Sequence, residues 1–410
     1  MWLGHVYLVF AAIVAAQNDT REPETRPENW DPDQCDCYLT GGEYYTGHSF
    51  WDFTDWSKCA GTPDIIDDEE KAAEAGFTCK FFKKKRWKKF WTIQSWNNHE
   101  DGSLDYGARF PMVNSASNMY FQNNDDDDDD DDSTFLTMRT SRLDSFQTAA
   151  QINSVDRFQY LSIRFLGRVH GSSGGCMAMF TYRHAKEIAN VQEADMEILT
   201  RDANNRVHYT NHPSYSIYGE QFPDATRNES LPRGIVWEDW VEHRMDWTPT
   251  RSVWYANDME VANISFQVPR DPSYMIFNTW SDGGFWTQNM TTGGEAFMDI
   301  QWIQMVYNVS DTKEKKKRDE ADSSPLAQRI AQGRRMFSHH SKRKTPENVC
   351  KMVCSIDGDN KGNDDGEPGE VTWLWGNSTA PRILIAGDPG GGTKFLVLWV
   401  FGVVTAVWFL

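Results

Sequence analysis

Three acidic residues alternate along one short segment of the sequence. Glu193, Asp195 and Glu197 are separated by single apolar residues and are followed by an Ile-Leu pair. In a strand, alternate side chains point to opposite faces, so the three acids share one face and the apolar residues enter a core. Like charges this close cannot all ionise at their ordinary pKa. The pattern therefore predicts that at least one proton is held near neutral pH, as an acid catalyst requires.

Two carboxylates can also cleave a glycosidic bond with retention. One attacks the anomeric carbon while the other, about 5 Å away, protonates the leaving oxygen. On an ideal strand, Glu193 and Glu197 have Cα atoms about 13 Å apart. This chemistry requires a curved strand on which both side chains lean inward, with Asp195 between them. Two other interpretations of the same residues are a solvent-facing acidic stripe on an edge strand and a calcium site.

The surrounding sequence is typical of short strands. Residues 35–309 contain alternating or aromatic-rich segments broken by Gly, Pro, Asn and Asp, with almost no helical periodicity, such as 157–165, 176–182, 194–200, 251–255, 260–266 and 300–307. Regularly spaced segments of this kind predict an all-β sandwich.

Three sequence blocks occur in order across about residues 135–309. A Gly-rich aromatic strand (174–182) precedes the acidic motif, residues 240–258 contain Asp-Trp-Thr-Pro and Trp-Tyr, and residues 275–284 end in Asp-Gly-Gly. Together they resemble the signature of family 16 glycoside hydrolases, the laminarinase, lichenase and transglycosylase group. Segments at 35–38, 51–53 and 209–214 are similar to a fungal cell-surface branch of that family.

The resemblance implies a fold and three roles. The fold would be a concanavalin A-like β-jelly-roll sandwich of two curved antiparallel sheets with a cleft on the concave face. Glu193 would be the nucleophile and Glu197 the general acid/base, while Asp195 would orient Glu193. The small Ala194, where the family has a larger apolar residue, and the acidic run at 125–132 depart from the pattern without removing any of these groups.

The resemblance also suggests side chains for sugar subsites, since aromatic rings stack on the apolar faces of sugars and amides bond their hydroxyls. The expected substrate-binding residues are Trp280, Trp286, Tyr209 and Asn211.

Other aromatic and histidine residues are assigned to structure. Trp247 and Trp254 occupy strand-like positions and are expected in the core. His212 and His243 have no metal-ligand company in the sequence, so we interpret both as structural or surface residues. Zinc is not expected, because no CxxC repeat faces a second pair at metal-site spacing. No other metal site and no cofactor are expected.

The ends of the chain have the composition of targeting segments. Residues 1–16 are apolar, end in Val-Ala-Ala and predict a signal peptide. Residues 17–34 form an N-terminal segment before the domain at 35–309. Residues 310–394 are charged and are predicted to be a low-complexity linker. The uncharged tail at 395–410 predicts a cleaved GPI-anchor signal, or alternatively a retained membrane anchor.

Sequons and cysteines support export. Six Asn-x-Ser/Thr sequons predict glycosylation at Asn18, Asn228, Asn263, Asn289, Asn308 and Asn377. The seven cysteines are then expected to form disulfides with one left over, and four of them lie before residue 80. Cys35 and Cys37 are too close to bridge each other and should reach different partners.

The charge balance limits the partners. With 41 Lys and Arg against 60 Asp and Glu, the formal net charge is -19, which argues against nucleic acid as a partner. The resemblance and the targeting segments together predict a secreted, surface-anchored retaining enzyme that acts on the β-glucan of a cell wall. We expect the enzyme to be a monomer. A cell-wall transglycosylase and a non-catalytic carbohydrate-binding protein are the alternatives.

Overall fold

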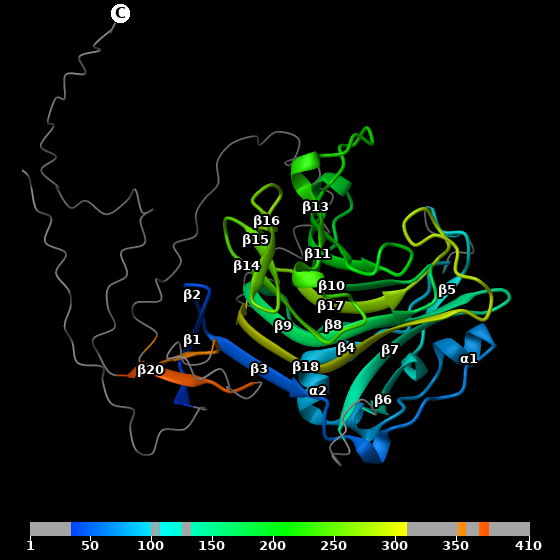
Figure 1. Ribbon diagram of the computed structural model, residues 1–410, viewed down its shortest axis with the longest axis horizontal. Helices are drawn as coiled ribbons and strands as arrows, with labels where there is room; N and C mark the ends of the chain where they lie inside the picture. Colours follow the sequence, from blue (N-terminus) through cyan, green and yellow to red (C-terminus); the bar gives the residue numbers. More distant parts are fainter. Residues whose placement is uncertain are drawn as a thin grey trace, which may run out of the picture.

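Strands dominate the computed structural model, which describes residues 34–99, 104, 107–124, 133–309, 350, 352–357 and 369–376. Most of the strands lie on one continuous path that doubles over into two facing, mainly antiparallel layers (Figure 1). The path turns where β7 (Thr134–Arg142) pairs with β8 (Gln147–Ser154). The prediction of an all-β sandwich of two antiparallel sheets is confirmed.

The first layer, which we call the cleft sheet, carries the acidic motif on β11. From its free edge to β8 it comprises β13 (Thr226–Ser230), β12 (Arg206–His212), β11 (Gln192–Leu199), β10 (Cys176–Arg183) and β17 (Tyr274–Trp280). Two short strands extend it on β8, which are β4 (Trp91–Ile93) and β5 (Met112–Asn114).

The second layer, which we call the back sheet, begins at β7. Its further strands are β18 (Glu295–Val309), β9 (Phe158–Gly171), β14 (Val241–Trp247), β15 (Ser252–Ala256) and β16 (Met259–Ile264), with β3 (Gly47–Asp52) on β18 and β6 (Met119–Asn123) on β7.

Helices are short and lie in the connections. The α-helices of the described chain are α1 (Glu69–Ala73) and α2 (Lys85–Phe90). The 3₁₀ turns are Ser57–Cys59, Lys80–Lys83, Ala116–Asn118, Ile188–Asn190, Pro223–Ala225 and Pro232–Gly234. None of the helices within the described ranges is long and apolar enough to cross a membrane.

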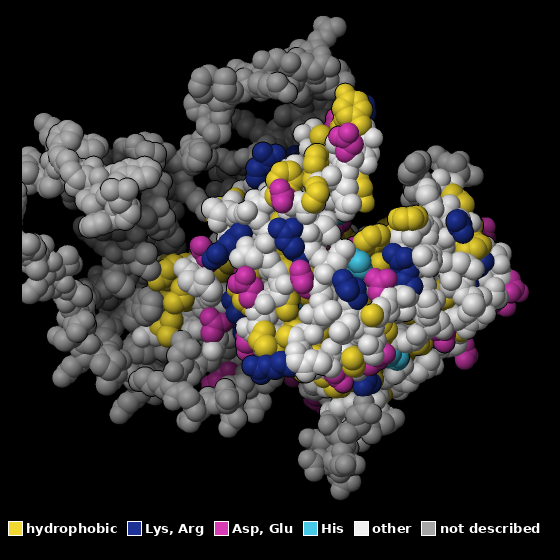
Figure 2. Space-filling view, turned by 45° about the horizontal axis from the view of Figure 1, so that its top comes forward, with side chains coloured by type: hydrophobic (Ala, Val, Ile, Leu, Met, Phe, Trp, Pro, Cys, Tyr) yellow, Lys and Arg dark blue, Asp and Glu magenta, His cyan; other side chains and the backbone are white. Residues whose placement is uncertain are grey.

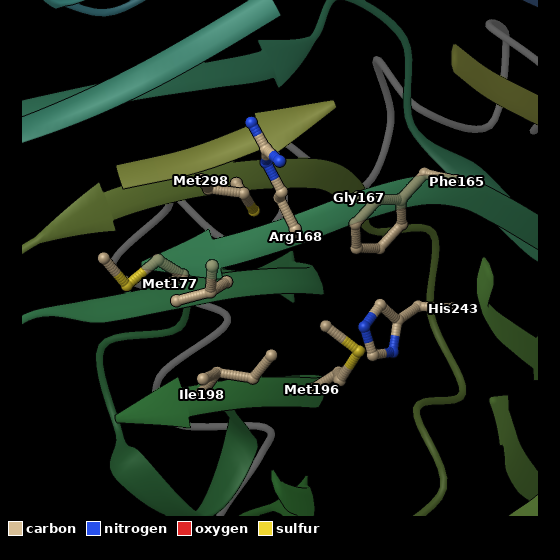
Figure 3. A pocket seen from close by; sticks show the side chains of 9 residues that line it. Phe165, Gly167, Arg168, Met177, Met196, Ile198, His243 and Met298 are labelled. Carbon is tan, nitrogen blue, oxygen red and sulfur yellow. The ribbon is translucent and has the colours of Figure 1, made fainter. Parts of the chain in front are cut away.

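Apolar side chains from both sheets meet in one core. Figure 3 shows a part of it in which Met196 of β11 lies beside His243 of β14, and Ile198 lies further along β11. The gap that the lining side chains enclose has no room for a water molecule. Burial lowers the pKa of His243 to about 4, so the neutral ring packs there. His243 is thus a structural residue, as expected, and Trp247 and Trp254 are fully buried core residues, also as expected.

A separate small sheet joins the two ends of the described chain, and we call it the clasp sheet. Its strands run in the order β2 (Glu43–Tyr45), β1 (Cys37–Thr40), β19 (Met352–Ser355) and β20 (Thr372–Gly376). Disulfides Cys35–Cys354 and Cys37–Cys350 hold it together. The two neighbouring cysteines do reach different partners, and Cys59–Cys79 is the third bridge.

The clasp sheet corrects one sequence-based expectation. Residues 310–394 were predicted to be a linker throughout, but 352–355 and 372–376 within them are strands. Their few apolar residues suffice because Val353 and Val371 are buried against the N-terminal strands, and the bridges replace the missing core. The predicted signal peptide, the acidic run at 125–132 and the apolar tail lie outside the described residues.

Charged side chains fasten the clasp sheet to the back sheet. Asp357 accepts a hydrogen bond from Arg164 of β9 at 2.6 Å and another from Thr40 of β1 at 2.7 Å. Arg244 of β14 pairs with Asp246 at 2.7 Å and also donates to Thr40. Burial alone would raise the pKa of Asp357, but the bonds from Thr40 and Arg164 outweigh it and leave that pKa below its usual value.

Candidate active site

The three acids of β11 lie on the floor of a cleft. Ala194, Met196 and Ile198 are buried in the core, so the alternation of the strand turns Glu193, Asp195 and Glu197 to the other face. All three line a cleft of about 400 Å³ in the cleft sheet. The predicted arrangement of three acids on one face is therefore observed.

The floor of the cleft follows rows across the strands. Glu197 lies opposite Ala178 of β10, which lies opposite Asn278 of β17, which lies opposite Gln151 of β8. Directly paired residues share a face, so an acid, a small side chain and two amides stand in one line. The small Ala178 leaves space in the middle of that line, and the cleft is open to a chain that crosses the strands.

Asp195, the middle acid, is 3% exposed and is held from β12. Nε2 of His212 lies 2.8 Å from Oδ2 of Asp195, and Nδ1 of His212 lies 3.2 Å from Oγ of Ser214. The β11–β12 register, which pairs Glu193 with His212, brings this imidazole to the acids. The interpretation of His212 as a merely structural or surface residue is wrong, because the ring is bonded to the acidic motif.

Glu197, the last acid, receives two hydrogen bonds on one oxygen. Trp286 donates its Nε1–H to Oε1 at 3.2 Å, and Cys176 donates its S–H to the same oxygen at 3.4 Å. The Trp286 ring is packed edge-on to His208, with ring centroids 5.2 Å apart. His208 is in turn hydrogen-bonded to Asp202 at 2.6 Å. This bond fixes the ring against which Trp286, the donor to Glu197, is packed.

Burial and mutual repulsion keep protons on the acids. Burial raises the pKa of Glu193 and of Asp195 well above their usual values, and the neighbouring carboxylates raise both further. Burial also raises the pKa of Glu197, while His212 and the donors Cys176 and Trp286 act in the opposite direction. His212 likewise opposes the rise at Glu193. The expected proton-holding site is thus present at this motif.

The same groups have the composition of a metal site. Glu193, Asp195 and His212 each offer one ligand atom, and these atoms lie within 4.8 Å of one another. Because His212 and Asp195 are already bonded to each other, a cation would have to displace that hydrogen bond.

Two of the four predicted substrate-binding residues lie at the cleft. Trp280 lines it, and Trp286 touches Glu197. Tyr209 and Asn211 do not, and the expectation that they bind sugar is wrong. Both are buried on the core face of β12, where Tyr209 packs against Trp254 and Asn211 donates to the carbonyl of Phe266 at 3.0 Å. A shift of one residue along the strand changes the face, so His212 rather than Asn211 reaches the acids.

The cleft also contains residues that the sequence did not single out. Trp96 is 37% exposed and lines it together with Asn98, Asn114, Gln151 and Asn278. These residues come from β5, β8, β17 and the segment after β4. No motif marks them, because their common position depends on strand pairing between distant segments.

The connection between β12 and β13 projects beside the cleft. It begins at His212, directly opposite Glu193, and carries the exposed side chains of Ile217 and Tyr218. Figure 2 shows hydrophobic side chains gathered on this projection at the top of the described surface.

The predicted glycosylation sites differ in exposure. Asn228, Asn263 and Asn289 are exposed, whereas Asn308 is half-buried and accepts hydrogen bonds from Thr46. Asn18 and Asn377 lie outside the described residues. Modification at these positions stays a prediction.

A β-sandwich with clustered acids on the floor of a cleft and aromatic side chains beside them is an architecture of carbohydrate-cleaving enzymes. Residues 110–304 match the model of the family described as "Glycosyl hydrolases family 16". The chain therefore carries a domain of family 16 and is a glycoside hydrolase, which confirms the resemblance drawn from the sequence.

Solved structures similar to this chain include three β-glucan-degrading enzymes. The β-glucanase of Bacillus licheniformis is 16% identical, with a TM-score of 0.41 and coverage of 53% of this chain and 92% of that chain. The laminarinase catalytic domain of Thermotoga maritima is 19% identical, with a TM-score of 0.41 and coverage of 54% and 93%. The endo-β-1,3-glucanase of Pyrococcus furiosus is 16% identical, with a TM-score of 0.44 and coverage of 67% and 99%. No curated protein sequence matches this chain.

Proposed function

We propose that the protein is a secreted, surface-anchored retaining glycoside hydrolase that cleaves β-glucan, with Glu193 as the nucleophile and Glu197 as the general acid/base. The observation that carries this proposal is the row of three acids on the floor of the cleft, with Asp195 buried between two half-buried Glu residues and the pKa of each raised. A pure binding site gains nothing from such repulsion, whereas acid catalysis needs a proton held in place.

The surroundings of the two Glu residues differ in a way that supports this division of roles. Glu193 stands opposite His212, which opposes the rise that burial and Asp195 cause in the pKa of Glu193 and so favours the carboxylate that attacks. Glu197 instead receives hydrogen bonds from neutral donors. Its pKa is raised by burial, which suits the protonated form that starts the reaction.

The proposed reaction has two balanced steps. Glu193 forms a bond to the anomeric carbon, the glycosidic C–O bond breaks, and Glu197 gives its proton to the leaving oxygen. A water molecule then attacks the same carbon, Glu197 takes a proton from that water, and the bond to Glu193 breaks. The net result is hydrolysis with retained configuration.

The cleft favours a polymeric substrate. The line from Glu197 over Ala178 to Asn278 and Gln151 crosses four strands and offers amides for sugar hydroxyls. Trp96 and Trp280 offer ring faces in the same cleft. The names of the similar solved structures, among them a laminarinase and an endo-β-1,3-glucanase, favour β-1,3 or mixed β-1,3-1,4 linkages.

The proposed location rests on the sequence and on the disulfides. Three bridges suit an oxidising compartment, and they agree with the predicted signal peptide and the sequons. The apolar tail at 395–410 supports attachment to a membrane, by GPI or by the tail itself. Release from cells by phospholipase C supports GPI, and retention in the membrane fraction contradicts it.

Two conservative variants test the catalytic proposal. Glu193→Gln and Glu197→Gln should each reduce the cleavage of β-1,3 and mixed-linkage glucan by at least about 10³-fold while circular dichroism shows a folded β-protein. Glu242→Gln is the matched control, because Glu242 is also a largely buried Glu with a raised pKa but lies on the back sheet. Full activity of either cleft variant would end the proposal.

The same assay separates the alternatives. A fluorescent acceptor oligosaccharide that becomes elongated indicates transglycosylation, because the glycosyl-enzyme intermediate then passes to a sugar instead of to water. Binding of glucan without release of reducing sugar over a wide pH range indicates a non-catalytic carbohydrate-binding protein. Hydrolysis products that dominate at millimolar acceptor support the enzyme as proposed.

A further inference from the structure

Cys176 is the one cysteine of the seven that forms no disulfide. It lies on β10, two residues from Ala178 and therefore on the cleft face, and it is fully buried. Its register partners are Leu199 of β11 and Trp280 of β17. The thiol is thus enclosed directly beneath the cleft, next to the proposed acid/base.

The thiol of Cys176 donates its hydrogen bond toward Glu197. Trp280, the register partner of Cys176 on β17, acts as a donor toward the sulfur, since an indole N–H can only donate. The single proton of the thiol is then available for Oε1 of Glu197, at 3.4 Å. Trp286 donates to the same oxygen at 3.2 Å. The thiol of Cys176 and the indole of Trp286 are therefore two donors that meet on one oxygen of Glu197.

The thiol keeps its proton in this environment. Burial raises the pKa of Cys176 well above its usual value, and the charges of Glu197 and Asp195 raise it further. A thiol in apolar surroundings of this kind is an inert donor and not a nucleophile.

We propose that Cys176 is a positioning residue for Glu197: together with Trp286 it holds Oε1 and leaves the other carboxyl oxygen to exchange the proton with the glycosidic oxygen. The proposal deepens the proposed function and rests on Glu197 being the acid/base. The structural observation behind it is that Cys176 and Trp286 both donate to Oε1 of Glu197.

Removal of the thiol should affect proton donation more than binding. In Cys176→Ala, Glu197 loses a donor that favours its charged form, so the alkaline limb of the kcat/KM profile should move to higher pH. The kcat on glucan should fall about 2- to 10-fold, since the carboxyl is held by one donor only. A β-glucan oligosaccharide with a dinitrophenyl leaving group, which needs little protonation, should change less than twofold in kcat. Cys176→Ser, which retains an O–H donor, should restore most of the glucan activity.

A packing control separates positioning from general damage to β10. Met179 lies on the same strand but faces the core, opposite Met196. Met179→Leu should leave the alkaline limb where it is in the wild-type protein. A limb that moves equally in both variants, or that does not move in Cys176→Ala, overturns the positioning role.

The contact can be measured without any activity. Because the other six cysteines are bridged, the infrared S–H stretching band of the oxidised protein should come from Cys176 alone. The band should lie at the low frequency of a hydrogen-bonded thiol, disappear in Cys176→Ala and move up in Glu197→Ala. An S–H band whose frequency is unchanged in Glu197→Ala refutes the proposal even if the wild-type protein cleaves glucan. Wild-type protein that cleaves no β-glucan at all refutes the proposed function and the positioning role, whereas the infrared shift then still reports the contact itself.

Discussion

Nε2 of His212 lies 2.8 Å from Oδ2 of Asp195, which joins an imidazole on β12 to the middle acid of β11. Asp195 is almost fully buried, while the His212 side chain is 31% exposed. The acidic motif is therefore not an isolated row of carboxylates. It is the buried end of a hydrogen-bonded chain from Ser214 through His212 to Asp195.

Loss of His212 should weaken catalysis and change its pH dependence. A hydrogen bond to a charged group is worth about 1.5–3 kcal/mol, so kcat of His212→Ala should fall about 10- to 150-fold. Because His212 opposes the rise in the pKa of Glu193, its removal should raise that pKa further and move the acidic limb of kcat/KM to higher pH. His212→Gln, which keeps a donor, should recover part of kcat. Steady-state kinetics from pH 3 to 9 measure both effects.

His170 provides a matched control for that variant. Its Nε2 lies 3.0 Å from Oδ2 of the buried Asp299, but this pair belongs to the back sheet. His170→Ala should change the acidic limb by no more than experimental error. An unchanged limb in His212→Ala, or an equal movement in both variants, would contradict the role of His212.

The ionised acids in the cleft should lower the free energy of unfolding at neutral pH. In the unfolded chain Glu197 ionises near 4.5, and in the folded chain its pKa is higher. Between these two values the folded chain binds more protons, so stability falls as the pH rises. Glu197→Gln should therefore be more stable than wild type at pH 7, with a Tm at least about 2–4 °C higher, and the difference should shrink below pH 4.5. Scanning calorimetry at both pH values checks this, and a less stable Glu197→Gln at pH 7 would be the contrary result.

Trp96 should contribute to binding and not to the chemical step. Its partly exposed ring lines the cleft and has no contact with the acids among the described interactions. Loss of stacking costs about 0.5–1.5 kcal/mol, so Trp96→Ala should raise KM for glucan about 2- to 12-fold with kcat unchanged. An unchanged KM would exclude Trp96 from the path of the substrate.

Substitution of Tyr209 should reduce the stability of the protein and not its binding of substrate. Because its ring is 1% exposed and packs against Trp254, Tyr209→Ala creates a cavity in the core. The expected loss is about 3–5 kcal/mol of the free energy of unfolding. Denaturant titration measures this loss. A stable variant with a raised KM would instead restore the sugar-binding role that the resemblance suggested.

Asp357 should stabilise the clasp sheet above its pKa. Since the folded-state pKa is lowered, the contribution is present above about 3.8 and is lost as the pH falls through the folded value. Asp357→Asn should lose about 1–3 kcal/mol at pH 6, because Arg164 and Arg244 lose a charged partner, and the loss should diminish toward pH 3. Asp64→Asn, at an exposed carboxylate, should change the free energy of unfolding by less than about 0.5 kcal/mol. Equal effects of the two substitutions would contradict the anchoring role.

Local patterns in the sequence were sufficient for the sheet and for the acids. The alternation around Glu193 predicts a strand with one acidic face, and buried Met196 and Ile198 confirm which face is which. Trp280 and Trp286 were also found, because they lie in the third sequence block or directly after it. These features depend on spacing within a few residues.

Features that depend on pairing between distant segments could not be predicted in the same way. The pairing of β11 with β12 puts His212 at the acids and turns Tyr209 and Asn211 to the core, and a change of one residue in register would reverse this. Cys35 and Cys37 bind cysteines more than 300 positions away. The segment that contains Cys350 and Cys354 has a linker-like composition, so the strands Met352–Ser355 and Thr372–Gly376 of the clasp sheet were missed.

The most direct test of the catalytic account is to trap the covalent intermediate. A 2-deoxy-2-fluoro β-glucan oligosaccharide with a dinitrophenyl leaving group should add one glycosyl group to the intact protein. Peptide mapping by mass spectrometry should then place that group on Glu193, and Glu193→Gln should remain unlabelled. Label on any other residue, or rapid turnover of glucan by a protein that never becomes labelled, would contradict the account.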